Sequence, residues 1–356
     1  MNSISDRLSE WRQSQGKTVQ QMAGLTGIDQ ALISKYENGN RLPSEKHVER
    51  LAVAMDLPLQ ELRKLLLAEK IAQIIEYEPN AAEILIAAES RIEYLRSSRA
   101  LTVSEIEPST LAKLEELDRL RDNWIKSKPK TGIQLEKLKE YFSVQYTYDS
   151  NRIEGNTLSL QETHLVIKEG LTISGKSMRE HLEAINHAHA IEWVQSLVSG
   201  KEDLNKRNVL DLHRLILRSI DQDNAGKYRQ VPVRISGSQH MPPEPYLIEK
   251  LMEDFFIHYQ RQRLLLHPVL LAAEMHERLV SIHPFIDGNG RTARLIMNFI
   301  LLRNGYAMVI LKGDEESRLE YYQALEKVQT ENDPDVFYHL IIDKALESLR
   351  DHLSMV

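Results

Sequence analysis

Residues 283–294 bring together residue types that bind phosphates and move protons. Gly288, Asn289 and Gly290 form a turn signal directly ahead of a run with helical spacing. Glycine lets backbone amides approach a ligand closely, and the start of a helix offers free N–H groups at the positive end of the helix dipole. The sequence therefore predicts an anion-binding site where this turn meets its helix.

Four charged or titratable side chains accompany the predicted anion site. Arg291 and Arg294 are three residues apart and share one face of the first helical turn, where two guanidinium groups suit a polyphosphate. Asp287 offers hard oxygen ligands to Mg²⁺, which usually bridges phosphates, and His283 can take a proton from an attacking hydroxyl. Each residue alone would more often be structural. Their joint spacing indicates transfer of a phosphorus-containing group to a hydroxyl.

This stretch resembles the catalytic motif of the Fic (filamentation induced by cAMP) family, HPFx(D/E)GNGRxxR, and matches it at every position. The resemblance spans roughly residues 111–345 and implies protein adenylylation, in which AMP moves from ATP to a Ser, Thr or Tyr hydroxyl of a target protein. It implies that His283 is the catalytic base and that Asp287 binds Mg²⁺. The residues implied to bind ATP are Gly288, Asn289, Gly290, Arg291, Arg294, Asn298 and Tyr322.

Two details refine this assignment. The Doc branch of the family, which phosphorylates, typically has alanine and lysine where this chain has Gly288 and Gly290, so the glycines favour nucleotidyl transfer. Asn298 and Tyr322 are placed near the adenine by the resemblance, while their helical spacing leaves a packing role open.

A second motif ends the helical run near residues 141–155. Ser150 and Glu154 are four residues apart and share a helix face, and Gly155 suits a left-handed helix end. A carboxylate near a helix C-terminus is unfavourable toward the helix dipole, so Glu154 needs a partner. The string resembles the Fic inhibitory motif, (S/T)xxxE(G/N). It implies that Glu154 pairs with Arg294, occupies the γ-phosphate position and allows only unproductive ATP binding; a plain capped helix is the alternative.

The strand signal lies near residues 228–243. Val231, Val233 and Ile235 alternate with other residues ahead of a turn, and Pro232 would confine such a strand to a sheet edge. The segment resembles the Fic flap, a β-hairpin whose edge would dock a target segment next to His283 by main-chain pairing. An ordinary surface hairpin is the alternative.

The first 65 residues have the pattern of short helices joined by polar turns. We expect helices over residues 5–14, 18–25, 29–37, 45–55 and 58–67, with Thr18 and Asp29 as N-caps. The pattern resembles the Cro/repressor-type helix-turn-helix family, which implies DNA binding through the major groove. The implied DNA contacts are Gln20, Gln30, Ser34 and Lys35.

Charge leaves an alternative open for this N-terminal module. Residues 1–65 contain nine Lys/Arg and eight Asp/Glu, so the attraction to DNA phosphates is weak for a monomer. A homodimer would compensate through two half-sites, whereas a module that only docks or dimerises would need no DNA.

Residues 66–110 are predicted to form a helical arm and linker, and residues 111–356 the Fic domain. The fold class that follows is all-α with a small β-hairpin flap. The arm carries an apolar stripe that needs burial and favours a dimer. Its members are Leu66, Ile71, Ile74, Ile75, Ile84 and Leu85.

Composition excludes several classes of protein. The chain has 356 residues with 42% hydrophobic and 27% charged residues, which is typical of globular proteins. The absence of cysteine excludes disulfides, thiolate zinc sites and a cysteine nucleophile. A net charge of −7 argues against polyanion binding along the whole chain. The start lacks an apolar signal segment, and no apolar run approaches the ~18 residues of a membrane span, so we expect a cytoplasmic protein.

The sequence as a whole predicts an autoinhibited protein adenylyltransferase with a DNA-binding module. One alternative is a DNA-binding transcriptional regulator whose Fic domain senses nucleotide or chiefly removes AMP. Another is a scaffold whose N-terminal module only dimerises. The presence of both His283 and Asp287 favours the enzyme, because a pure sensor needs no base.

Overall fold

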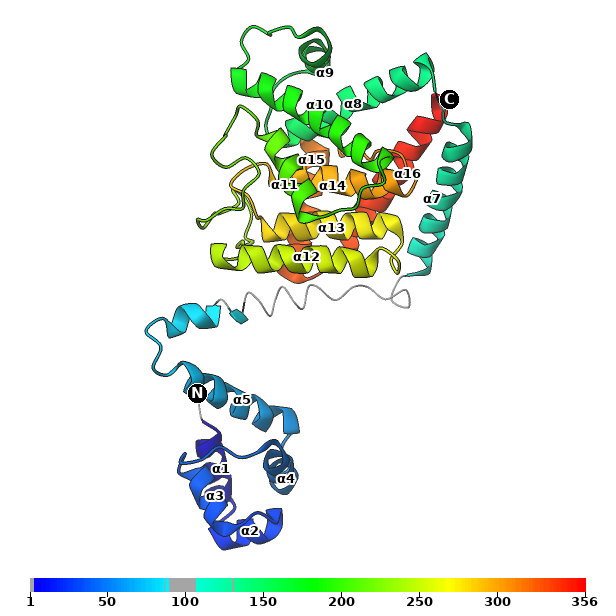
Figure 1. The fold of residues 1–356 in the computed structure, drawn as a ribbon. Coiled ribbons are helices and arrows are strands. Elements are labelled where there is room, and N and C mark those ends of the chain that lie inside the picture. Colours follow the sequence, from blue (N-terminus) through cyan, green and yellow to red (C-terminus); the bar gives the residue numbers. More distant parts are fainter. Residues whose placement is uncertain (1–2, 87, 90–106, 130) are drawn as a thin grey trace. The chain divides into compact units, whose positions relative to one another are not determined.

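The computed structural model describes residues 3–86, 88–89, 107–129 and 131–356 (Figure 1). The chain forms two compact units, the N-terminal unit Met1–Glu89 and the C-terminal unit Ser90–Val356. Every regular element in the described ranges is helical, which confirms the predicted all-α class. In these same ranges no helix is long and apolar enough to cross a bilayer.

The first four helices of the N-terminal unit begin and end within one residue of the predicted bounds, whereas the fifth, predicted to end at residue 67, continues to Ile75. The Thr18 side chain accepts a hydrogen bond from Gln21 N, and the Asp29 side chain accepts from Ala31 N and Leu32 N. Gly27 ends a helix in the left-handed conformation with φ of 64°. The helices are α1 (Ile4–Ser14), α2 (Val19–Thr26), α3 (Gln30–Glu37), α4 (Glu45–Met55) and α5 (Leu59–Ile75).

A small apolar core holds these helices together. Met22, Ile28 and Ile33 are buried in it, and α5 contributes Leu62 and Leu66. Helix α5 therefore continues past residue 65, the predicted end of the helix-turn-helix domain, and Leu66 beyond that point still packs into the same core.

The predicted arm stripe is only partly buried within the described residues. Leu66 packs into the core, whereas Ile71, Ile74, Ile84 and Leu85 are exposed. The part of the predicted arm and linker at residues 87 and 90–106 lies outside the described residues.

In the C-terminal unit two buried helices lie side by side, with the other helices packed around them (Figure 1). These two are α13 (Pro268–Ile282) and α14 (Asn289–Arg303), and residues 283–288 connect them. The surrounding elements are α7 (Pro108–Ser127), α8 (Ile133–Ile153), α9 (Leu160–His164), η2 (Leu165–Glu169), α10 (Met178–Ser199), α11 (Lys206–Ile216), η3 (Pro245–Leu247), α12 (Ile248–Gln262), α15 (Glu315–Glu331) and α16 (Asp335–Ser354).

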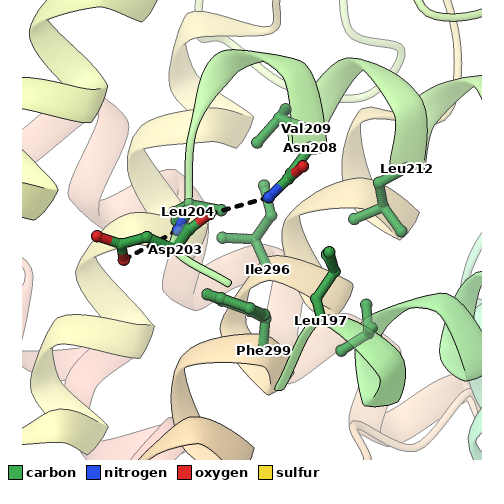
Figure 2. A pocket seen from close by; sticks show the side chains of 9 residues that line it. Leu197, Asp203, Leu204, Asn208, Val209, Leu212, Ile296 and Phe299 are labelled. Atoms are coloured by element: carbon green, nitrogen blue, oxygen red, sulfur yellow. Dashed lines mark hydrogen bonds between the residues drawn. The ribbon is translucent and has the colours of Figure 1, made fainter. Parts of the chain in front are cut away.

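The apolar side of α14 closes against the turn between α10 and α11. Figure 2 shows Ile296 and Phe299 of α14 facing this turn around a cavity of about 10 Å³. The polar groups of the turn bond one another: Asn208 Nδ2 donates to Asp203 O at 2.9 Å. A cavity this small holds at most about one water molecule. It is a gap in the core, and the candidate site lies at the other face of α14.

The predicted β-hairpin flap is not formed: the segment near residues 228–243 contains no strand. It has no regular secondary structure and contains a turn in which Ser238 N donates to Ile235 O at 3.3 Å. Pro232 and the neighbouring prolines have no N–H to donate. The carbonyls of Val231 and Pro243, which a hairpin would pair across its strands, instead accept from one arginine side chain.

Candidate active site

The loop between α13 and α14 is fixed by internal contacts. Phe285 is fully buried and stacks on the His213 ring, with ring centroids 3.7 Å apart. The amide of Asn289 donates to Phe285 O and accepts from Phe285 N, both at 2.9 Å. Gly288 has φ of 79° and forms the N-cap of α14. The loop therefore presents the first turn of a helix with its N–H groups free for an anion.

The Asn289 side chain differs from its expected role. The resemblance implied an ATP contact, but both ends of this amide bond the backbone of Phe285 inside the loop. Because the side chain is committed to closing the loop, only the backbone N–H of Asn289 is left to contact an anion.

His283 lies where α13 ends and is held in a left-handed conformation with φ of 49°. Its Nδ1 lies 3.3 Å from Val280 O, and a carbonyl only accepts, so Nδ1 carries the proton and Nε2 keeps its lone pair. Burial, together with the positive charges of Arg229 and His240, lowers the pKa of His283 to about 4. The ring is therefore neutral near pH 7, as a general base must be.

Asp287 is ionised and bound by two arginines. Its Oδ1 accepts from Gly288 N at 2.5 Å and from Arg291 Nη2 at 3.2 Å, and its Oδ2 accepts from Arg179 Nη2 at 2.6 Å. Burial acts to raise the pKa of this carboxyl, but the two guanidinium groups and the Gly288 N–H hold it below its usual value.

The chemistry of Asp287 suits Mg²⁺ held jointly with phosphates. Over the described ranges no group of three or more His, Asp or Glu side chains forms a protein-only metal site. Mg²⁺ commonly uses one or two carboxylates plus substrate phosphates. The Arg179 side chain is 58% exposed, so it can move away from Oδ2 when a cation approaches.

Arg294 connects α14 to the end of α8. It is 1% exposed, and its Nη2 donates to Glu154 Oε1 at 2.7 Å. Its Nε donates to Ser150 Oγ at 3.0 Å, and Nη2 also donates to Ser150 O at 2.9 Å. Although burial acts to lower the pKa of Arg294, the charge of Glu154 raises it overall. The pair predicted from the motif is present in the structure.

The Glu154 carboxylate lies against the first turn of α14. A Cβ added at Gly290 would be 2.4 Å from Glu154 Oε1, so only glycine leaves room for the carboxylate here. Gly155, with φ of 96°, turns the chain directly after Glu154. An anionic group of the protein itself therefore lies beside the predicted anion site at this helix N-terminus.

Asn298 and Tyr322, expected near the adenine, have different environments. The Asn298 amide accepts from Val309 N at 2.7 Å and donates to Val309 O at 2.9 Å, and the residue is 1% exposed. It is the packing amide left open as an alternative. Tyr322 is 40% exposed and its hydroxyl donates to Ile153 O at 3.1 Å, beside the end of α8.

Sequence reasoning missed three residues that hold this site. Arg179 joins Asp287 to Glu183, which lies 3.4 Å from Arg291 Nη1. His213 Nε2 donates to Asp287 O at 2.9 Å, while its Nδ1 accepts from Gly226 N. Arg179 and Glu183 lie on α10 and His213 on α11, far from the motif in the sequence. A single charged residue or histidine on such a helix gives no signal of a functional role.

The four expected DNA contacts lie on α2 and α3 of the N-terminal unit. Gln20, Gln30 and Lys35 are exposed, and Ser34 is half-buried. Their side chains are thus on the surface of the two helices that form the helix-turn-helix.

Comparison with known proteins gives matches to both units. Residues 203–301 match the Fic/DOC family model, and residues 3–66 match a helix-turn-helix domain model. The chain is 35% identical over 249 residues to protein adenylyltransferase Fic of Aedes aegypti, covering 69% of this chain and 49% of that protein. It is 32% identical over 329 residues to protein adenylyltransferase Fic of Drosophila melanogaster, covering 91% of this chain and 63% of that protein. The chain thus spans about half to two-thirds of the length of these relatives.

Solved structures show the same fold. Fic-1 from C. elegans matches with a TM-score of 0.61 and 27% identity, covering 88% of each chain. A Fic domain containing signaling protein from Bacteroides thetaiotaomicron matches with a TM-score of 0.61 and 28% identity, covering 68% of this chain and 97% of that one.

Proposed function

This chain contains a Fic/DOC family domain at residues 203–301 and a helix-turn-helix domain at residues 3–66, and from this premise we propose that it is an autoinhibited protein adenylyltransferase. Its substrates are ATP and a protein that bears a Ser, Thr or Tyr hydroxyl. The observation that carries the proposal is the Glu154 carboxylate, which lies 2.7 Å from Arg294 Nη2 of α14, the helix that directly follows the loop holding His283 and Asp287.

The proposed reaction transfers AMP from ATP to the target hydroxyl by one displacement at the α-phosphorus. The target hydroxyl oxygen attacks the α-phosphorus of ATP, and its proton passes to Nε2 of His283. The bond from the α-phosphorus to the oxygen bridging to the β-phosphate breaks, and pyrophosphate leaves. Arg291, Arg294 and the N–H groups at the start of α14 stabilise the phosphate charge. Mg²⁺, bound by Asp287 and the phosphates, would supply further charge neutralisation.

Autoinhibition by Glu154, called the brake from here on, follows from the charge and the position of its carboxylate. The Glu154 carboxylate and the terminal phosphate of ATP are both anions that bind Arg294, so they compete for one guanidinium group. While Glu154 keeps its place, ATP binds with its phosphates displaced and the α-phosphorus is out of line for attack. Losing the carboxylate frees both Arg294 and the space above Gly290.

Incorporation of label from α-labelled Mg·ATP tests this proposal, with a cell lysate as the source of target hydroxyls. Glu154→Gly should raise incorporation at least tenfold over the wild type, and adding His283→Ala should abolish it. Glu169→Gly is the matched control, because Glu169 is also an exposed glutamate at a helix end but lies away from Arg294. Equal incorporation by the wild type and Glu154→Gly would reject the brake, and persistence with His283→Ala would reject the base.

A DNA-binding regulator is the second candidate, supported by the helix-turn-helix match and by exposed polar side chains on α3. The N-terminal residues of α3, headed by Gln30, would reach base edges, and Lys35 would contact phosphate. A dimer would supply a second half-site, and the exposed Ile71 and Ile74 of α5 offer an apolar contact for it. Gel shifts on the DNA upstream of the coding sequence, with and without ATP, test this function. Gln30→Ala with Lys35→Ala should remove the shift.

If nucleotide sensing or AMP removal is the main activity of the Fic domain, adenylylated protein incubated with the wild type should release AMP faster than Glu154→Gly adds it. Retention of the AMP would leave adenylylation as the activity.

A further inference from the structure

Arg229 is a buried arginine whose partners are unusual. It is 2% exposed, and in the part of the chain that the structure describes all its hydrogen bonds go to backbone. Burial lowers its pKa, with Glu244 acting in the opposite direction. A charged side chain is costly to bury without dense hydrogen bonding, so the burial of Arg229 requires a structural explanation.

The guanidinium group joins the catalytic loop to both ends of the flap segment, defined here as residues 228–243. Nε donates to His283 O at 2.8 Å, Nη1 to Val231 O at 3.0 Å and Nη2 to Pro243 O at 2.5 Å. The backbone N–H of Arg229 also donates to Pro284 O at 2.9 Å. One planar fork therefore sets three carbonyls relative to one another.

His283 is the residue that most needs such support. Its φ of 49° lies in the left-handed region, where a non-glycine residue persists only if its surroundings hold it. The carbonyl bound by Arg229 Nε belongs to this same residue, so the bond restrains the peptide plane that aims the imidazole. A second flap bond, from His240 Nε2 to Ser281 O at 2.9 Å, joins the flap segment to the last turn of α13.

We propose that Arg229 is a positioning residue for the adenylyl transfer, which fixes the backbone of His283 and locks the flap segment to the catalytic loop as the surface that docks the target. The inference rests on the proposed function. Arg229 acts through His283 and the flap, and the ATP anion site at Arg294 lies outside its hydrogen bonds.

Arg229 also contributes charge near His283. The groups that face this imidazole are the Val280 carbonyl, Arg229, His240 and Glu154, of which Arg229 and His240 lower the pKa of His283. Removing the guanidinium charge should therefore raise that pKa toward 6.5. A lysine at 229 keeps the charge but loses the fork, so geometry and charge can be separated.

The test compares Arg229→Lys and Arg229→Gln in the Glu154→Gly background, with lysate protein and α-labelled Mg·ATP. Both variants should lower the rate at saturating ATP at least tenfold, and the dissociation constant of ATP should stay within about twofold. Arg229→Gln should move the acid limb of the pH–rate profile upward, and Arg229→Lys should leave it in place. Limited proteolysis should cut both variants faster within the flap segment. Arg261→Gln is the matched control, because Arg261 is an exposed arginine of α12 that lies outside the flap segment and the catalytic loop, and it should match the parent.

Each other outcome rejects the inference. Rates within twofold of the parent for Arg229→Lys would do so, as would equal losses in rate and in ATP affinity. If both variants melt below the assay temperature, the side chain is required for folding and the positioning role falls. Absence of any transfer by Glu154→Gly itself would instead reject the proposed function.

Discussion

At the scale of single residues, the activity of the site depends on which anion binds Arg294. Arg294 is fully buried and needs an anionic partner, which ATP phosphates and Glu154 can both provide. Ser150 also binds Arg294, since its hydroxyl and its carbonyl both accept hydrogen bonds from it. Both acceptors are uncharged, so each bond is weaker than the bond to Glu154. The brake is therefore a set of three bonds of unequal strength.

Ser150→Ala should release this brake in part. It removes the acceptor for Arg294 Nε but keeps the Ser150 carbonyl and Glu154. A hydrogen bond to a charged group contributes about 1.5–3 kcal/mol, or roughly 10- to 150-fold, so transfer should rise by at least about tenfold and remain below that of Glu154→Gly. Initial rates of label transfer from ATP measure both variants. A rate equal to the wild type would show that Ser150 only packs.

Side-chain pairings were predictable where a motif specified both partners, and individual roles were harder to predict. The pairing of Glu154 with Arg294 follows from the resemblance and is present. The side-chain partners of Asn289 and Asn298 were not predictable, because an amide can bond phosphate or backbone equally well and only the fold decides which it meets. Arg229 and Arg179 were missed for a related reason: their partners are carbonyls or carboxylates that lie far away in the sequence.

At the scale of elements, the flap segment shows how local propensity yields to tertiary contacts. Alternating Val231, Val233 and Ile235 predict a strand, yet a strand needs a partner and Arg229 takes the carbonyls that would pair. The chain is held instead two residues ahead of the segment, where Gly226 N donates to His213 Nδ1 at 2.9 Å.

Gly226→Ala should destabilise the C-terminal unit more than Gly237→Ala. Both glycines have positive φ, 71° and 81°, so both changes carry the same backbone penalty. A Cβ at 226 would also lie 2.9 Å from Leu210 O, whereas a Cβ at 237 meets nothing within 4 Å. We expect an extra loss of about 1–3 kcal/mol for Gly226→Ala, measured by chemical denaturation. Equal losses would mean that the backbone at Gly226, just ahead of the flap segment, is loosely packed.

At the scale of the whole molecule, helix type and most boundaries were predictable, since apolar spacing and caps such as Thr18 are local signals. The core of the C-terminal unit was not, because α13 and α14 are buried on all sides and lose the one-sided pattern of a surface helix. Such burial also traps several histidines in neutral form.

The C-terminal unit should lose stability between pH 6.5 and about pH 4. Burial lowers the pKa of His276 to about 3 and that of His352 to about 4. The unfolded chain binds protons at these sites below pH 6.5 while the folded chain does not, so acid favours unfolding. At pH 5 each site should cost on the order of 2 kcal/mol. Thermal melts at pH 7 and pH 5 measure the loss, which His352→Asn should reduce. A melting temperature unchanged between these pH values would contradict the buried neutral histidines.

The most direct test of the central claim uses two labels on ATP. Glu154→Gly is incubated with Mg·ATP labelled at the α-phosphate or, separately, at the γ-phosphate, and labelled protein is counted. Because the hydroxyl attacks the α-phosphorus, only the α-label should appear on protein, and His283→Ala in the same background should remove it. Transfer of the γ-label, or no transfer of either label, would contradict adenylyl transfer at this site.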